Sequence, residues 1–117
     1  MIVWYVPEGV FPPGNHRESA ALTLYFAYED WCLSQFAKSL GREDIFKRYY
    51  NRSFNYRNLF DSSVGWIRPK LENGEWYHNF TPIEKGFNAK GFVEGNSAIF
   101  TYYVPHNLPD LIELVGG

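Results

Sequence analysis

The sequence predicts a mainly α-helical chain, in which an antiparallel helical hairpin is followed by a small β-hairpin and two short helices. Residues 17–40 contain neither proline nor glycine and are rich in helix-forming residues. Asn73-Gly74 lies between two short aromatic segments, a pattern typical of a tight β-turn. The 117 residues have the size of one modest domain, and we find no internal boundary within residues 1–117.

The helical hairpin is predicted from two periodic segments with a short link. Residues 17–40 form the first helix, and Gly41 follows at the position of a C-terminal cap. Residues 43–60 form the second helix, with acidic residues in its first turn and aromatic residues at helical spacing. The first helix is apolar on more than one stripe, so we expect it to be buried on most sides, with Cys32 as a buried, unreactive thiol.

The second half of the chain has weaker signals. We expect residues 65–68 and 75–78 to pair as a β-hairpin with a type I′ turn at Asn73-Gly74. Residues 81–90 are predicted to form a loop, and helices are predicted over 97–103 and 108–115, the former ended by Pro105. At the N-terminus, residues 2–6 are predicted to be a short extended piece before a proline-rich loop.

The composition excludes several classes of function. A formal charge of −2 gives no electrostatic reason for binding nucleic acid or an anionic membrane. No apolar run is long enough for a transmembrane helix, and the first residues lack the pattern of a secretory signal. With Cys32 as the only cysteine, neither an internal disulfide nor a cysteine-rich metal site can form. Aromatic residues make up 20%, which suits both a core and a sugar-stacking surface.

Two places hold candidate carboxylates. Glu94 lies between a glycine-flanked turn and an apolar aromatic run within residues 91–107. A carboxyl group at the mouth of an apolar pocket can keep its proton near neutral pH and act as a general acid, as in glycosidases. The alternative is that Glu94 lies in the first turn of a helix and complements its dipole. Glu29 and Asp30 lie in the wall of the first helix, where pairing with a nearby arginine is favoured over a catalytic role.

The sequence resembles the α-mannosidases of glycoside hydrolase family 92. The similar runs follow one another in order over nearly all of the chain from about residue 23. They are Thr-Leu-Tyr-Phe-Ala-Tyr-Glu-Asp-Trp-Cys at 23–32, Gln-Phe-Ala-Lys-Ser-Leu-Gly at 35–41, Arg-Ser-Phe-Asn-Tyr-Arg-Asn-Leu-Phe-Asp at 52–61, Gly-Trp-Ile-Arg-Pro at 65–69, Asn-Gly-Glu-Trp at 73–76, Glu-Gly-Asn at 94–96, Tyr-Val-Pro-His at 103–106 and Leu-Ile-Glu-Leu-Val-Gly-Gly at 111–117.

The resemblance implies a segment of a larger catalytic domain, an (α/α)6 toroid preceded by a β-sandwich domain. Members of the family resemble calcium-dependent, exo-acting α-mannosidases that invert the anomeric centre, are secreted or periplasmic, and act on α-mannosides or N-glycan-type oligosaccharides. By this resemblance Glu94 is the general acid, and Asn96 and His106 are substrate-binding residues; we assign no metal ligand within the chain. The catalytic-base aspartates would lie beyond Gly117, so we expect the isolated 117 residues to be inactive.

The sequence departs from the family's pattern in places that bear on the substrate. The usual Ala-Trp-Gln-Tyr after Glu-Gly-Asn is Ser-Ala-Ile-Phe here, so Ala98 removes a stacking face and Ile99 removes an oxygen ligand. The usual His-Asp is His106-Asn107, and an acidic position of the first helix is Tyr25. These changes leave two alternatives open. One is a non-catalytic carbohydrate-binding or structural relative, and the other is an (α/α)6 glycosidase for a different α-linked hexoside.

Overall fold

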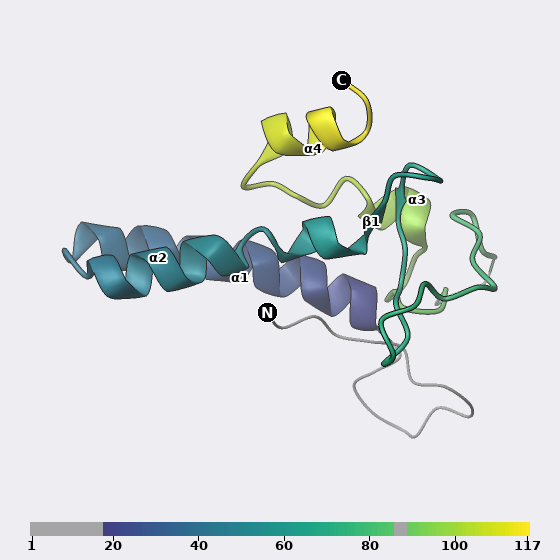
Figure 1. The fold of residues 1–117 in the computed structure, drawn as a ribbon, viewed down its shortest axis with the longest axis horizontal. Helices are drawn as coiled ribbons and strands as arrows, with labels where there is room; N and C mark the ends of the chain where they lie inside the picture. The colour runs from purple at the N-terminus through teal and green to yellow at the C-terminus, as the bar shows by residue number, and fades with distance from the viewer. Residues whose placement is uncertain (1–17, 86–88) are drawn as a thin grey trace.

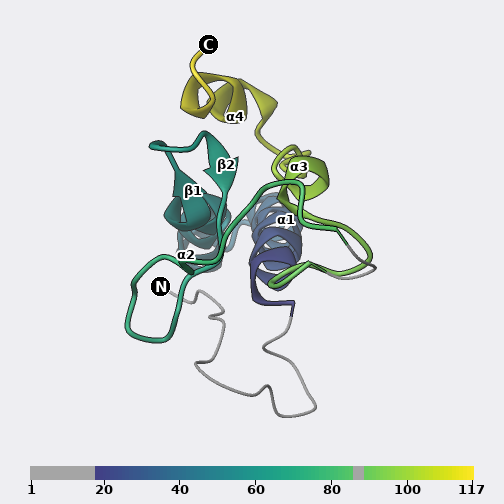
Figure 2. The same ribbon diagram turned by 90° about the vertical axis from the view of Figure 1, so that its right-hand side faces the viewer.

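The computed structural model describes residues 18–85 and 89–117, and the extended piece expected over residues 2–6 lies outside this range. The described chain is mainly helical, with one small two-stranded sheet (Figures 1 and 2). In chain order the elements are α1 (Ser19–Ser39), α2 (Glu43–Arg52), the 3₁₀ helix η1 (Asn55–Leu59), β1 (Phe60–Asp61), β2 (Trp66–Ile67), α3 (Ser97–Phe100) and α4 (Leu108–Leu114).

Helices α1 and α2 form the predicted antiparallel hairpin, in which α2 lies beside the second half of α1 at one end of the molecule (Figure 1). Gly41 turns the chain between them with a φ of 69°. Helix α2 is shorter than predicted, because it ends at Arg52 and the chain continues through a turn into η1. At this point the Ser53 hydroxyl donates to the Tyr50 carbonyl at 2.6 Å, a local bond that competes with helix propagation.

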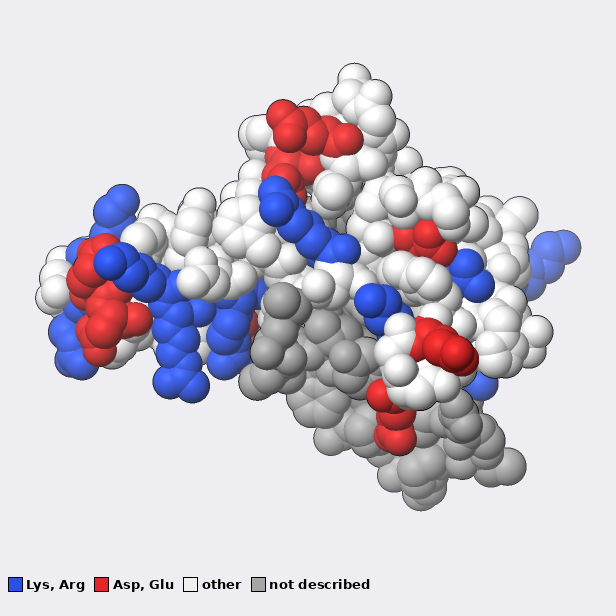
Figure 3. Space-filling model, viewed as in Figure 1, with Lys and Arg blue, Asp and Glu red and all other residues white. Residues whose placement is uncertain are grey.

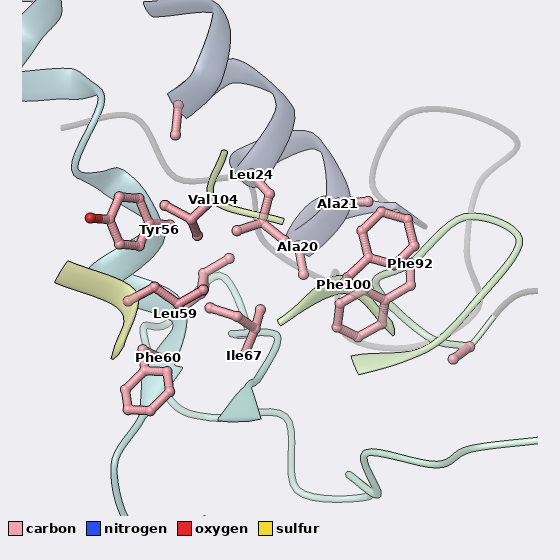
Figure 4. Packing of buried hydrophobic residues seen from close by; sticks show 13 residues of the cluster. Ala20, Ala21, Leu24, Tyr56, Leu59, Phe60, Ile67, Phe92, Phe100 and Val104 are labelled. Carbon is pink, nitrogen blue, oxygen red and sulfur yellow. The ribbon is translucent and has the colours of Figure 1, made fainter. Parts of the chain in front are cut away.

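The core lies where the first half of α1 meets η1, the sheet and the chain around α3 (Figure 4). Leu24, Leu59 and Ile67 are almost fully buried there. Each such side chain contributes roughly 1.5 to 3 kcal/mol on burial. The cluster comprises Ala20, Ala21, Leu24, Ala27, Tyr56, Leu59, Phe60, Ile67, Ala89, Phe92, Phe100, Val104 and Leu111.

The expectation that α1 is buried on most sides is wrong for this chain. Its buried positions follow one helical face, while Phe36 and Leu40 are 62% and 61% exposed. Cys32 also lies on the exposed side, so it is not the buried thiol that we expected. The reason is that among the described elements only α2 and η1 pack closely along α1.

The small sheet differs from the predicted hairpin. Strand β2 pairs antiparallel with β1, with Phe60 opposite Ile67, rather than with residues 75–78. The Asn73-Gly74 turn does form, with one bridge between Lys70 and Trp76. It is not a type I′ turn, because of its two residues only Gly74 has a positive φ, of 86°.

Helix α3 is shorter than expected and α4 has nearly the expected length. The hydroxyl of Ser97 in α3 donates to the Ile67 carbonyl at 2.5 Å, and the Thr101 hydroxyl accepts from the Ile67 amide at 3.0 Å. These bonds attach α3 to the free edge of β2. Helix α3 and the residue that follows it are therefore tied to the sheet through Ile67 of β2.

Helix α4 is attached to η1 by one carboxylate. Asp110 accepts hydrogen bonds from the Tyr56 hydroxyl and from both Nε and a terminal nitrogen of Arg57, the Nε bond being 2.8 Å long. In Figure 3 acidic atoms on α4 meet basic atoms at the junction with the helices beneath it. The hydrogen bonds from Arg57 hold the pKa of Asp110 below its ordinary value, and Tyr56 adds to this shift.

Replacing Asp110 by asparagine in the complete parent protein is expected to loosen α4. The change removes the charge that Arg57 pairs with, at a cost of about 1 to 2 kcal/mol, because solvent screens the half-exposed Arg57. Amide hydrogen exchange in α4 should become faster, whereas Glu113→Gln, an exposed change on the same helix, should have no effect.

The same attachment should depend on pH. Since the folded pKa of Asp110 is depressed, its contribution is present above the unfolded value of about 3.9 and is lost as the pH falls through the folded pKa. Exchange in α4 should therefore accelerate in acid for the wild type more than for Asp110→Asn. Equal acceleration in both proteins would contradict this role of Asp110.

Candidate functional site

Glu94 is an exposed residue with a left-handed backbone, on a turn whose neighbouring residues Phe92 and Gly95 are buried. Its φ is 47°, and no other non-glycine residue in the described parts of the chain has a positive φ. That region is sparsely populated by residues with a side chain, so the surrounding structure must hold Glu94 there. Helix α3 begins only at Ser97, so Glu94 is not the first-turn residue of the alternative interpretation. The turn instead presents the carboxylate to solvent beside the first turns of α1.

Gly91 anchors this turn to α1. Its carbonyl accepts from the amides of Ala20 and Ala21 at 2.9 and 3.0 Å, which satisfies two of the free donors at the start of the helix. Gly91 has a φ of 91°, and a Cβ at this position would lie 2.5 Å from Cγ of Pro69. Both the backbone conformation and the close approach therefore require glycine.

The loop that carries Glu94 is also closed on itself. The Ala89 amide donates to the Gly95 carbonyl at 3.0 Å, and the Phe92 amide donates to the Ala89 carbonyl at 2.9 Å. The buried ring of Phe92 packs on Phe100 at 5.6 Å between ring centroids. The position of Glu94 is thus set by backbone bonds and by the core, on both sides of the residue.

The turn of Glu94 meets an aromatic cluster around Tyr25, because a Cβ on the next residue, Gly95, would lie 3.2 Å from Phe100, whose ring packs on Tyr25. Burial is the main cause that raises the pKa of the Tyr25 phenol, and the charges of Glu18 and Glu94 add to the shift. The ring of Tyr25 packs edge-on against Tyr103 at 5.3 Å and against Phe100 at 6.0 Å. A carboxylate at the open edge of an aromatic cluster can transfer a proton to a bound ligand.

Asn96 has a structural partner at each end of its amide group. Its Oδ1 accepts from the Ile99 amide at 3.3 Å, which caps α3, and its Nδ2 donates to the Glu84 carbonyl at 3.4 Å. Asn107 caps α4 in the same way, through a bond of 3.4 Å from the Asp110 amide. The predicted role of Asn96 in substrate binding stays a prediction.

His106 lies among aromatic rings on the other side of the cluster. Its Nε2 contacts the Ser53 carbonyl at 2.8 Å, and the rings of Tyr28, Trp31 and Tyr56 lie 6.0, 6.2 and 5.6 Å away. Burial lowers the pKa of His106, although the bond to Ser53 opposes the shift. A neutral ring with its proton on Nε2 fits this arrangement. The predicted contact of His106 with substrate stays a prediction, and the geometry favours a role in holding Tyr28 and Trp31.

Of the other two candidate carboxylates, Asp30 has the structural role that was favoured. Asp30 is buried and pairs with Arg52, at 3.0 Å between Oδ2 and Nε, which links α1 to α2. Burial raises the pKa of Asp30 although Arg52 opposes this. Glu29 is exposed on α1. In the part of the chain that the structure describes, no group of three His, Cys, Asp or Glu side chains is placed to hold a metal ion.

Sequence reasoning overlooked Gly91 and Tyr103 as parts of this site. Gly91 lies three residues before Glu94, so its place near the turn can be read from the sequence. Its close approach to Pro69 cannot, because the two residues lie far apart in the chain. Tyr103 was assigned to a helix, whereas its ring joins Tyr25 and Tyr28. The site thus consists of one carboxylate on a fixed turn and a row of aromatic rings beside it.

Comparison with known proteins gives consistent matches. The sequence profile of the glycosyl hydrolase family 92 catalytic domain matches residues 3–117. A family 92 inverting mannosidase from Bacteroides thetaiotaomicron is similar at 41% identity and a TM-score of 0.82, over 97% of this chain and 14% of that one. A family 92 alpha-mannosidase from the same organism, solved in complex with mannoimidazole, is similar at 33% identity and a TM-score of 0.81, over 86% of this chain and 14% of that one.

A curated relative from Arthroderma benhamiae, named an uncharacterized secreted glycosidase, is 29% identical over 138 residues, which is 98% of this chain. The chain spans 18% of the length of that relative and 14% of the two solved mannosidases. Since the profile covers nearly the whole sequence and solved members share its fold, the chain belongs to glycosyl hydrolase family 92, matching part of that family's catalytic domain.

Proposed function

We propose that the chain is part of the catalytic domain of an exo-acting, inverting α-mannosidase, in which Glu94 is the general acid. Solved relatives described as mannosidases, one of them as inverting, support the class of reaction. The observation that supports Glu94 most is its exposed position on a left-handed turn that Gly91 fixes to α1. A proton donor must be held rigidly beside the leaving oxygen, and this turn supplies such a position.

In an inverting glycosidase two carboxyl groups divide the work. One protonates the oxygen of the departing group, while the other removes a proton from the water that attacks the opposite face of the sugar. The two groups lie about 6.5 to 9.5 Å apart to leave room for that water. We assign the first role to Glu94 and place the base outside this segment. The isolated 117 residues should then have no mannosidase activity.

Calcium stays a proposal for the parent protein, and the described residues do not by themselves fit a calcium site. Residues 18–85 and 89–117 contain no cluster of three His, Cys, Asp or Glu side chains, and the oxygen of Asn96 is engaged in capping α3. Ile99 supplies no oxygen where the family pattern has a glutamine. Any calcium would therefore be held mainly by residues elsewhere in the parent domain, and no step of the proposed reaction depends on it here.

The proposed partners are an α-mannoside or an N-glycan-type oligosaccharide and the remainder of the catalytic domain. The exposed side of α1, with Phe36 and Leu40, is where further helices of an (α/α)6 toroid would pack. The secreted relative from Arthroderma benhamiae supports a secreted or periplasmic location. None of the helices within the described ranges is both long and apolar enough to cross a membrane.

A second candidate is a carbohydrate-binding relative without turnover. It is motivated by Ala98 and Ile99, where the family pattern has a tryptophan and a glutamine, and by the 63% exposure of Ile99. Without a stacking ring and an amide at these two positions, the site would bind sugar through the remaining aromatic rings alone. This candidate predicts binding of mannose oligosaccharides by the parent protein with no release of mannose.

The product anomer tests the function directly. The complete parent protein, incubated with α-1,2-, α-1,3- and α-1,6-linked mannobiose, should release β-mannose first from at least one of them, as followed by proton NMR before mutarotation. Release of α-mannose first would contradict an inverting reaction. Binding of all three disaccharides by calorimetry with no hydrolysis would support the second candidate, and cleavage of other α-hexosides only would reassign the substrate.

A further inference from the structure

We propose that Tyr25, Tyr28, Trp31 and Tyr103 form an aromatic ledge on which a pyranose ring of the substrate stacks beside Glu94. This inference rests on the proposed function, because it assigns a substrate site next to the proposed acid. The ledge follows from the spacing of the rings, their accessibility and the charged groups around one end.

Three of the rings lie on one face of α1. Tyr25, Tyr28 and Trp31 follow one another at three-residue intervals, so they project from neighbouring positions over nearly two turns. With a rise of 1.5 Å per residue, the row is about 9 Å long. The planes of Tyr28 and Trp31 differ by only 13°, with centroids 6.5 Å apart, so the two rings are nearly parallel. All three side chains are half-buried rather than enclosed.

Tyr103 joins this row from the chain between α3 and α4. Its ring lies 5.3 Å from Tyr25 at 87° and 6.4 Å from Tyr28 at 77°, and the residue is 36% exposed. The neighbouring Tyr102 instead packs edge-on against Trp66 at 6.4 Å. Adjacent tyrosines therefore have different surroundings, and only Tyr103 belongs to the ledge.

The groups around the ledge suit a sugar better than a further apolar helix. The turn of Glu94 approaches one end of the ledge, because a Cβ on Gly95 would lie 3.2 Å from Phe100, whose ring packs edge-on against Tyr25 at 6.0 Å. After burial, the charges of Tyr103, Glu18 and Glu94 help to raise the pKa of the Tyr25 phenol. A sugar offers an apolar C–H face to an aromatic ring and a rim of hydroxyl groups to phenols and carboxylates. The exposed apolar side of α1 around Phe36 and Leu40 shows no such arrangement among the described contacts, which fits protein packing.

We place the glycosidic oxygen at the Tyr25 end of the ledge, because Tyr25 packs against Phe100 at 6.0 Å, and a Cβ on Gly95, the residue after Glu94, would meet Phe100 at 3.2 Å. At the other end His106 lies against Tyr28 and Trp31, with Nε2 bound to the Ser53 carbonyl, and so fixes those rings from behind. The stacked ring could be the mannosyl unit that is cleaved or the sugar that departs. Both share the same C–H face, and the choice of substrate distinguishes them.

The test uses the complete parent protein with Tyr103→Ala, Tyr103→Phe and the matched control Tyr102→Ala. Tyr103→Ala should raise KM for mannobiose by about tenfold with a smaller change in kcat. Tyr103→Phe, which keeps the ring, should raise KM less than Tyr103→Ala does, and Tyr102→Ala should stay within about twofold of wild type. If Tyr103→Ala also raises KM for mannosyl fluoride, the mannosyl unit stacks on the ledge. If Tyr103→Ala raises KM for mannobiose alone, the departing sugar stacks on the ledge.

An unchanged KM for both substrates in a folded Tyr103→Ala protein would overturn the ledge, and would indicate that these rings pack against protein. If Tyr103→Ala does not fold, Tyr28→Leu gives the same test without a cavity. If the wild-type parent hydrolyses no mannoside, the proposed function fails separately. The ledge is then tested by calorimetry with mannobiose, where Tyr103→Ala should weaken binding about tenfold and Tyr102→Ala should not; equal binding would overturn it.

Discussion

Glutamine in place of Glu94 in the complete parent protein is expected to lower kcat for α-linked mannobiose by about 10²- to 10⁴-fold. The amide has nearly the shape of the carboxyl group but cannot donate the proton that the departing sugar oxygen needs. Hydrolysis of mannosyl fluoride should stay within about threefold of wild type, because fluoride leaves with little need for protonation. The ratio of the two rates therefore isolates acid catalysis from binding.

The structure makes this substitution a clean one. Glu94 is exposed, and its turn is held by the backbone bonds of Gly91, Ala89 and Gly95, which glutamine at position 94 leaves in place. Glu29→Gln, an exposed change on α1, is the matched control and should leave both rates unchanged. If Glu94→Gln slows both substrates equally, Glu94 has another role; if it slows neither, the general acid lies elsewhere.

Alanine in place of Gly91 is expected to have the second largest effect. The new Cβ would lie 2.5 Å from Pro69, in a backbone with a φ of 91°. Strain in the left-handed region and overpacking together should cost about 2 to 4 kcal/mol of unfolding free energy. Since the Gly91 carbonyl joins the Glu94 turn to α1, the displacement should also lower kcat by about 10²-fold.

Gly74→Ala separates the cost of the left-handed backbone from the cost of overpacking against Pro69. Gly74 has a similar φ of 86°, but a Cβ added there would meet nothing within 4 Å, so alanine should cost only about 1 to 2 kcal/mol and leave kcat unchanged. Urea midpoints and kcat of the two variants of the parent protein give the comparison. Equal losses of stability in the two variants would show that the approach to Pro69 costs nothing. An unchanged kcat in Gly91→Ala would show that the attachment of Gly91 to α1 does not position Glu94.

The longest and the best delimited helices could be predicted from the sequence. Helix α1 has no proline or glycine over its whole length, and α4 begins after a capping asparagine, with proline near its start. Such signals lie within or next to the helix itself, so they can be recognised without knowledge of the tertiary contacts. The end of α2 could not be predicted, because it depends on the local side-chain bond of Ser53 rather than on the aromatic spacing, which continues past it.

The sheet could not be predicted because two-residue strands carry almost no pattern. Residues 65–68 and 75–78 looked like partners across Asn73-Gly74, yet β2 pairs with β1, the strand that directly follows η1. The bonds from α3 to Ile67 help to decide this pairing, and they join residues thirty or more positions apart. Contacts of this separation leave no trace in local sequence.

In the candidate site, too, some features can be predicted from the sequence and others depend on tertiary contacts. The sequence identifies Glu94 as a carboxylate close to aromatic residues, but its left-handed backbone and its link to α1 through Gly91 are tertiary features. The departure at Asn107 is explained by capping: its side chain bonds the Asp110 amide, a role in which asparagine and aspartate are equivalent. The replacement of a family tryptophan by Ala98 has no compensating contact that explains it.

The leaving-group dependence of kcat/KM tests the role of Glu94 most directly. A series of aryl α-mannosides, with leaving phenols of increasing pKa, would be hydrolysed by the complete parent protein and by its Glu94→Gln variant. With Glu94 as the general acid, log kcat/KM should vary little with leaving-group pKa in the wild type and fall steeply in the variant, because the unprotonated phenolate must then depart unaided. Parallel lines for the two proteins would contradict the assignment.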